Sequence, residues 1–98
     1  MEEVDLNLRL NVPEYFFDEP YGAKGYFSGC QLEYEGQTYN LSFYDPVRLA
    51  QTIKDDIESD GIFFEKNVIV VQSITVEHLE KAIQTLINAN QVYNLSPN

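Results

Sequence analysis

The amino-terminal segment alternates strictly between apolar and polar residues. Valine or leucine occupies every second position from Val4 to Val12, with Asp, Asn and Arg residues between them. A period of two is typical of a β-strand that buries one face, and we predict a strand over this segment. Pro13 lacks the backbone N–H that a sheet requires and is expected to end the strand.

A second alternating pattern predicts a β-hairpin. A two-residue turn at positions 36–37, of the type that places glycine first, pairs Leu32 with Leu41. The same register pairs Cys30 with Phe43 and gathers polar side chains on the opposite face. Moving the pairing by one residue would mix the two faces, which favours this register.

Two later segments carry apolar residues at helical spacing. The first helix is predicted to begin after the N-cap residue Asp45, with Pro46 in the first helical position, and to end at Gly61. The second is predicted to begin after Thr75 and to run out near residues 88–90. Their apolar stripes consist of Val47, Leu49, Ala50, Ile53 and Ile57 in the first helix, and Val76, Leu79, Ala82, Ile83, Leu86 and Ile87 in the second.

Shorter apolar runs lie between and after these helices. Residues 68–71 predict a strand that is buried on both faces, and residues 62–64 predict either its hairpin partner or only an approaching segment. The tail over residues 91–98 keeps three apolar side chains, and we expect it to dock on the domain before Pro97 frees the end of the chain.

The predicted order of elements is strand, loop, hairpin, helix, one or two strands, and helix. The early strands each have one apolar face and the helices each have one apolar stripe. The economical packing is therefore an α+β two-layer sandwich, with an antiparallel sheet and both helices on one face. Neither a linker nor an internal repeat interrupts residues 1–98, so we expect a single domain.

The charge of the chain excludes several classes of partner. Sixteen acidic residues against six basic ones give a formal net charge of −10 over 98 residues. Proteins that bind nucleic acid need clustered Lys and Arg to neutralise phosphates, so we expect no direct binding to nucleic acid or to anionic membranes. The sequence has no long apolar run, no basic leader at its start and one cysteine, and we expect a cytoplasmic protein.

The sequence lacks the residue patterns that catalysis or metal binding needs. Cys30 and His78 are the only cysteine and histidine, whereas a zinc site needs three or four ligands and a nucleophile needs a neighbouring base. We therefore expect no enzyme activity, no metal and no cofactor. In the predicted register Cys30 points into the core as an inert thiol rather than a reactive one, and His78 lies on the surface of the second helix.

Two acidic segments are the candidate binding surfaces. The loop over residues 13–25 interleaves aromatic and charged residues, which is typical of a recognition surface, although such a loop can also cover an edge of the core. Four carboxylates crowd the end of the first helix, where the helix dipole disfavours them; they form either a solvated face or a contact for a basic partner. The candidate partner-binding residues are Tyr15, Asp18, Glu19 and Tyr21 in the loop, and Asp55, Asp56, Glu58 and Asp60 in the helix.

Several short motifs follow one another along the chain. They are the turn at residues 35–37, the segments 39–49 and 61–71, and a closing helix from Thr75 that contains an Ala-Ile pair. Together they resemble small immunity proteins of bacterial polymorphic toxin systems. The likeness covers residues 34–87. It implies a non-enzymatic protein that binds and blocks a co-encoded toxin, often a basic nuclease.

The leading functional hypothesis is an acidic, non-catalytic binding protein that masks a basic protein partner. It rests on the net charge, the aromatic and acidic loop, and the lack of a catalytic pattern. One alternative is a structural or regulatory subunit that self-associates, so that the chain is a monomer or a weak homodimer. Another is a small metabolite-binding domain with a pocket beneath the aromatic loop.

Overall fold

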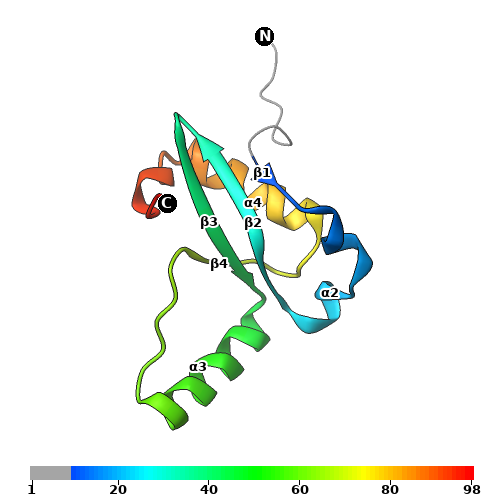
Figure 1. The fold of residues 1–98 in the computed structure, drawn as a ribbon, viewed down its shortest axis with the longest axis vertical. Coiled ribbons are helices and arrows are strands. Elements are labelled where there is room, and N and C mark those ends of the chain that lie inside the picture. The colour runs from blue at the N-terminus through cyan, green and yellow to red at the C-terminus, as the bar shows by residue number, and fades with distance from the viewer. Residues whose placement is uncertain (1–9) are drawn as a thin grey trace.

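The computed structural model describes residues 10–98 and has the predicted α+β architecture in two layers (Figure 1). Its four strands form one sheet in the order β1-β2-β3-β4. β1–β2 and β2–β3 are antiparallel, as expected, whereas β3 and β4 are parallel. The strands are β1 (Leu10–Asn11), β2 (Tyr26–Tyr34), β3 (Gln37–Tyr44) and β4 (Val68–Val70).

Helices join and cover these strands. The 3-10 helix η1 and the short helix α2 lie between β1 and β2, α3 lies between β3 and β4, and α4 and the 3-10 helix η2 follow the sheet. The long connection through α3 allows β4 to return beside β3 in the parallel direction, which a tight turn cannot do. The helices are η1 (Glu14–Asp18), α2 (Tyr21–Lys24), α3 (Pro46–Asp60), α4 (Val76–Asn88) and η2 (Val92–Asn94).

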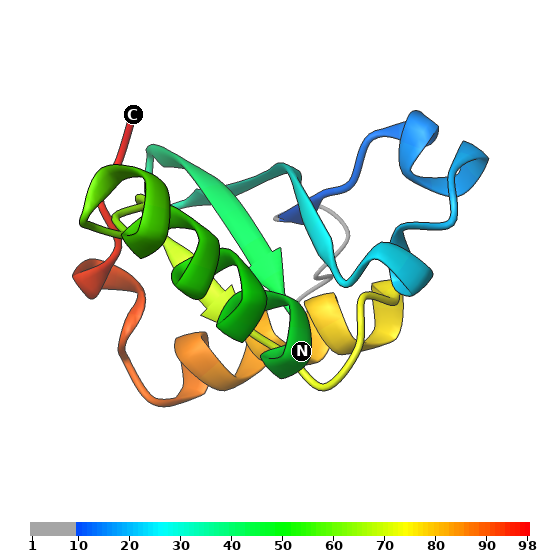
Figure 2. The same ribbon diagram turned by 90° about the horizontal axis from the view of Figure 1, so that it is seen from below.

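The core lies between one face of the sheet and α4 (Figure 2). Leu79 and Ile83 of α4 are fully buried, as are the strand residues Leu32 and Phe43. Cys30 is buried among them, as the alternating pattern predicts. The face of the sheet that carries Gln31, Glu33 and Asn40 is exposed there, in keeping with a sheet that buries one side.

Both long helices begin and end where the sequence predicts. The Asp45 carboxylate accepts a hydrogen bond from the Arg48 backbone N–H at 2.7 Å, and Gly61 ends α3 in the left-handed conformation at φ 80°. The Thr75 hydroxyl caps α4 by accepting from the His78 N–H at 3.2 Å. Local capping chemistry therefore sets the helix bounds.

The two helices differ in what they bury. We expected both on one face of the sheet; α4 supplies two fully buried residues there, whereas α3 has no buried residue and none that packs against the core. In Figure 1, α3 runs beyond the end of the strands, and the chain returns along residues 61–67 to enter β4. The apolar stripe of α3 is thus left partly open to solvent.

The hairpin register differs from the predicted one by two residues. The turn consists of Glu35 and Gly36, both at positive φ (50° and 80°), and Leu32 faces Tyr39 rather than Leu41. A shift of two leaves every side chain on its original face, so the apolar pattern cannot distinguish the two registers. The observed turn places glycine second, and its twist matches that of the strands.

The region before α4 also differs from expectation. Residues 62–64 form no strand and only approach the sheet. β4 is an edge strand, and Val70 is 47% exposed, so the prediction of a strand buried on both faces was wrong. At the amino terminus β1 covers residues 10–11, and the rest of the strand predicted from Val4 lies outside the described residues.

The carboxy-terminal tail docks along β3, but the expectation that Pro97 frees the end was wrong, because Asn98 is itself bonded to the strand. The Asn98 backbone N–H donates to the Thr38 carbonyl at 2.8 Å, and the Asn40 N–H donates to the Asn98 side chain at 3.2 Å. Asn67 joins the two segments because its amide donates to the Asn40 and Ser96 carbonyls, both at 2.9 Å, and accepts from the Ser96 N–H at 2.8 Å. The tail thus covers the part of the β3 edge that β4 leaves open.

Candidate functional site

The loop over residues 13–25 folds around an aromatic cluster. Phe16 is buried, and its ring stacks on Tyr21 with a centroid distance of 5.6 Å. Phe27 of β2 contacts both rings edge-on, at 4.8 Å from Phe16 and 4.6 Å from Tyr21. Part of the loop therefore covers the core, and Tyr21 belongs to that packing.

The outer side of the same loop is exposed. Tyr15 and Phe17 are exposed, and so are the carboxylates of Asp18 and Glu19. The Tyr15 hydroxyl lies so close to Gly29 that a Cβ atom at position 29 would collide with it. The loop therefore covers the edge of the core through Phe16 and Tyr21 and leaves Tyr15 and Phe17 exposed.

The second predicted group lies on the last turns of α3. Asp55, Glu58 and Asp60 are exposed and Asp56 is half-buried. Lys54 forms an ion pair with Glu58 at 2.8 Å, and the other three carboxylates have no ion pair with any of residues 10–98. This end of the helix is therefore strongly negative.

The structure does not bring the two groups together. α2 touches the start of α3, where Arg48 donates to the Lys24 carbonyl at 3.0 Å and the Asp45 N–H donates to the Gly25 carbonyl at 2.9 Å. The α3 carboxylates lie toward the opposite end of the helix, about 10 to 18 Å beyond Arg48 at 1.5 Å per residue. Figures 1 and 2 show the loop and the end of α3 on different sides of the molecule.

Sequence reasoning missed an exposed apolar segment beside the α3 carboxylates. Ile57 is 52% exposed, Ile62 is 62% exposed and Phe64 is 84% exposed. The apolar pattern predicts Ile57 as part of the buried stripe of the first helix, and it assigns residues 62–64 no binding role. The available signal was an apolar run between two acidic residues that matched neither the helical nor the strand period.

Glu65 anchors this segment to the sheet. Its carboxylate accepts hydrogen bonds from the Ser42 hydroxyl at 2.7 Å and from the Tyr44 hydroxyl. Burial, together with the hydrogen bond to Glu65 and its charge, raises the pKa of Tyr44. Because Glu65 points inward, its neighbour Phe64 in the extended chain points outward.

The described residues hold no catalytic arrangement that we can assign. The Cys30 thiol is buried, and burial raises its pKa from 9.0 to about 12, so it is protonated at neutral pH. His78 is half-buried rather than fully exposed, and its Nδ1 lies 2.9 Å from the hydroxyls of both Ser73 and Thr75. Because Thr75 also caps α4, these contacts belong to the helix start.

Within residues 10–98, no three His, Cys, Asp or Glu side chains gather closely enough to hold a metal ion. In the same part of the chain, no helix combines the length and the apolar character needed to cross a bilayer.

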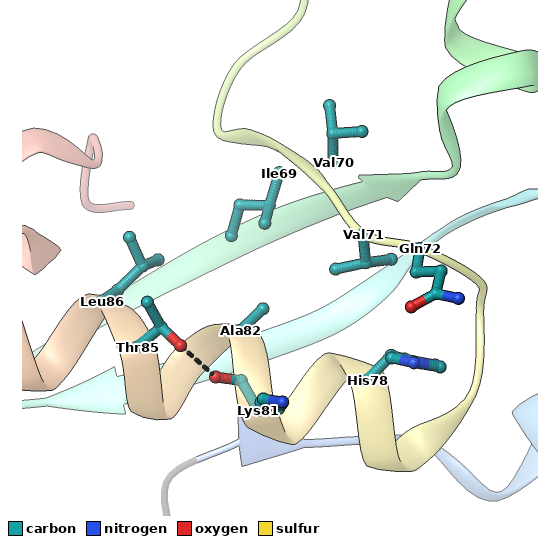
Figure 3. Close-up of a pocket in the computed structure, with 9 residues that line it drawn as sticks. All are labelled: Ile69, Val70, Val71, Gln72, His78, Lys81, Ala82, Thr85 and Leu86. Atoms are coloured by element: carbon teal, nitrogen blue, oxygen red, sulfur yellow. Dashed lines mark hydrogen bonds between the residues drawn. The ribbon is translucent and has the colours of Figure 1, made fainter.

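A groove of about 410 Å³ lies between β4 and α4 (Figure 3). Ile69 and Val71 line it from the strand, and Ala82 and Leu86 line it from the helix. Lys81 stands at its rim. The groove lies along the outer edge of the sheet, away from the two predicted surfaces.

Comparisons with family models, with curated proteins and with solved structures found no match to this chain.

Proposed function

We propose that this protein is an acidic, non-catalytic binding module that masks a basic surface of a partner protein. The binding surface that we assign is the α3 tip, defined as the exposed apolar residues Ile57, Ile62 and Phe64 together with the carboxylates Asp55, Asp56, Glu58 and Asp60. The aromatic loop is a second candidate contact through Tyr15, Asp18 and Glu19.

The observation that carries the proposal is an amphipathic helix that buries none of its residues. α3 has an apolar stripe over 15 residues, yet none of them joins the core. Single exposed apolar residues are ordinary on protein surfaces, whereas several together, rimmed by charges, are typical of an interaction site. The α3 tip places three such residues within ten consecutive positions.

The charge of the α3 tip favours a basic partner. Three of its four carboxylates have no ion pair with any described residue, and the helix dipole disfavours acids at a carboxy-terminal end. A placement that costs helix stability is understandable if the charges speed the approach of a positively charged protein. Apolar contacts with Phe64 and its neighbours would then hold the complex.

The resemblance of residues 34–87 to immunity proteins suggests the kind of partner. A toxin that attacks nucleic acid carries a basic surface, which an acidic binding protein can cover. We therefore propose a co-encoded toxin, such as a nuclease, as the partner and the cytoplasm as the site of action.

A photo-crosslinking amino acid at position 64 tests the proposal in the native cell. We expect it to capture a basic protein, identified by mass spectrometry, whereas the same probe at position 33, on the exposed face of the sheet, captures little. Replacing Asp55, Asp56 and Asp60 by Asn should reduce capture at position 64 several-fold. Equal capture from both positions, or capture that ignores these three charges, would refute the assigned surface.

Association kinetics with the captured protein test the electrostatic part. The association rate should fall about tenfold or more between low and physiological salt, since surface charges are screened within about 8 Å at 0.15 M. A rate that is indifferent to salt would contradict a role for the carboxylates.

A further inference from the structure

The outer edge of β4 has backbone groups that no described residue pairs. β4 is the last strand of the sheet, and its ladder with β3 runs through the Asn67 carbonyl, 3.1 Å from the Ser42 N–H, and the Val71 N–H, 2.9 Å from the Tyr44 carbonyl. Alternate residues of a strand point their backbone groups to opposite sides. Val68 and Val70 therefore direct their N–H and C=O groups away from the sheet.

This edge lacks the features that usually protect an edge strand. The run from Val68 to Val71 contains no charge and no proline, and no helix or loop of residues 10–98 hydrogen bonds to its outer side. Natural proteins blunt such edges with lysine, proline or a covering segment, because an open edge can pair with another strand. Among residues 10–98, the short length of the strand is the only protection that we find.

The groove beside β4 would receive the side chains of an added strand. Figure 3 shows Ile69 and Val71 directed toward α4, and Val70 directed to the opposite face. A strand placed along β4 has its side chains on the same two faces, and every second one enters the groove between β4 and α4. The groove is open to solvent rather than enclosed, which suits an extended polypeptide better than a small molecule.

Lys81 gives the groove its charge preference. Every other described Lys or Arg side chain has a hydrogen-bond or ion-pair acceptor, whereas the Lys81 ammonium has none among residues 10–98. The groove lining contains Lys81 and His78 and no carboxylate. In a chain with net charge −10, this is a local site for an acidic group.

We propose that an extended segment of a partner protein, apolar on one face and bearing a carboxylate there, adds to β4 as a fifth strand. The backbone of Val68 and Val70 pairs with it, its apolar side chains enter the groove, and its carboxylate meets Lys81. A second copy of this chain would present another Lys81 and no carboxylate from the same groove, so charge favours a different partner. The inference uses a surface separate from the α3 tip and does not depend on the proposed function.

Blocked heptapeptides test the proposal in solution. The probe peptide has Thr at alternate positions and Val, Val and Glu at the positions between them. One matched peptide carries Lys in place of Glu. Another keeps the probe sequence and carries N-methyl groups on the backbone edge that would pair with β4. In amide NMR spectra of the full chain, we expect the Glu peptide to shift Val68, Val70 and Lys81. The N-methylated peptide should bind about tenfold more weakly, since two backbone hydrogen bonds are lost.

Two protein variants separate backbone pairing from charge. Lys81→Glu replaces a surface attraction for the Glu peptide by a repulsion. It should therefore shift the ratio of the two peptide affinities by about three- to tenfold in favour of the Lys peptide. Val70→Pro removes one outward N–H, which an edge strand tolerates. This variant should weaken binding about threefold or more while the rest of the spectrum remains that of the folded protein.

Three outcomes would overturn the proposal. One is shifts that spread over the surface without β4. Another is equal binding of the N-methylated peptide. The third is concentration-dependent shifts at β4 in the absence of peptide, which would assign the edge to a second copy.

Discussion

The helices α3 and α4 have similar local features but differ in how far they are buried. Each begins at a side-chain N-cap and carries an apolar stripe. However, α4 buries Leu79 and Ile83 completely, whereas α3 has no fully buried residue. The difference lies in the last two turns of α3, where Asp56 and Asp60 fall on the same helical face as Leu49 and Ile53. Because a carboxylate without a partner is costly to bury, this stripe cannot pack against the core along its full length.

The comparison teaches that amphipathicity does not establish burial. An apolar stripe shows which face of a helix avoids water, and the covering surface can belong to the same domain or to a partner. α4 packs against the sheet of its own domain, and in our proposal α3 packs against another protein.

The sharpest test of the comparison is a matched pair of isoleucine truncations. Ile83→Ala in α4 should lower the free energy of unfolding by about 2 to 5 kcal/mol, because it removes a buried side chain and leaves a cavity. Ile57→Ala in α3 should lower it by no more than about 0.5 kcal/mol, since the side chain is half exposed. Urea titrations of both variants provide the measurement, and similar losses would mean that α3 is packed as α4 is.

High pH should weaken the core that α4 covers. The Cys30 pKa rises from 9.0 to about 12 on folding, so only the unfolded chain releases this proton between those values. The stabilising contribution is complete below pH 9 and falls by about 1.4 kcal/mol per pH unit above it.

Urea midpoints between pH 8 and pH 11 measure this slope, and Cys30→Ala supplies the control. The Cys30→Ala variant should be less stable than the unmodified protein at pH 8, and its free energy of unfolding should fall less steeply as the pH rises. Tyr44, whose pKa is also raised, adds to the slope in both proteins. If the two slopes are equal, the thiol does not couple to folding.

Removal of the two N-caps should separate local from global stability. Thr75→Ala should lower the free energy of unfolding of the whole domain by about 1 kcal/mol, because α4 holds the core together. Asp45→Ala should leave global stability within about 0.5 kcal/mol and accelerate amide exchange within α3 about fivefold, since α3 can open by itself. A global loss equal to that of Thr75→Ala would show that α3 unfolds only with the core.

The smallest effect concerns charges at helix ends. Asp60→Asn removes an acid from the carboxy-terminal end of α3 and should raise stability by about 0.3 kcal/mol at low salt. Glu77→Gln removes an acid from the first turn of α4 and should lower stability by a similar amount. Thermal unfolding at low and high salt checks both signs, and a loss on Asp60→Asn would assign this carboxylate a structural role.

Local chemistry made much of the fold predictable. Asp45 and Gly61 mark the two ends of α3, and Thr75 marks the start of α4. The alternation around Leu32 assigns residues 30–34 to the correct faces, whereas the bulge between Phe27 and Cys30 interrupts the alternation earlier in β2. The hairpin register was wrong because a shift of two residues preserves that alternation.

The candidate site was less predictable because its determinants are distant in the chain. Glu65 bonds to Ser42 and Tyr44, 23 and 21 residues away, and this contact turns Phe64 outward. No pattern within one segment carries that information. The predicted carboxylates are mostly exposed. Whether those of the loop and those of α3 share one face of the molecule depends on the direction in which α3 leaves the sheet. The hydrophobic periodicity of the sequence does not define that direction.

Asn67 joins two segments that the ribosome synthesises far apart in time. Its side chain spans from Asn40, 27 residues earlier, to Ser96, 29 residues later. During synthesis, the stretch of β3 around Asn40 remains uncovered until residues 96–98 have left the ribosome, several seconds after β3 itself at typical elongation rates of about 5–20 residues per second. The newly made hairpin is therefore open to mispairing for that interval, and variants of Asn67 should reduce the yield of folded protein in cells more than they reduce its stability once folded.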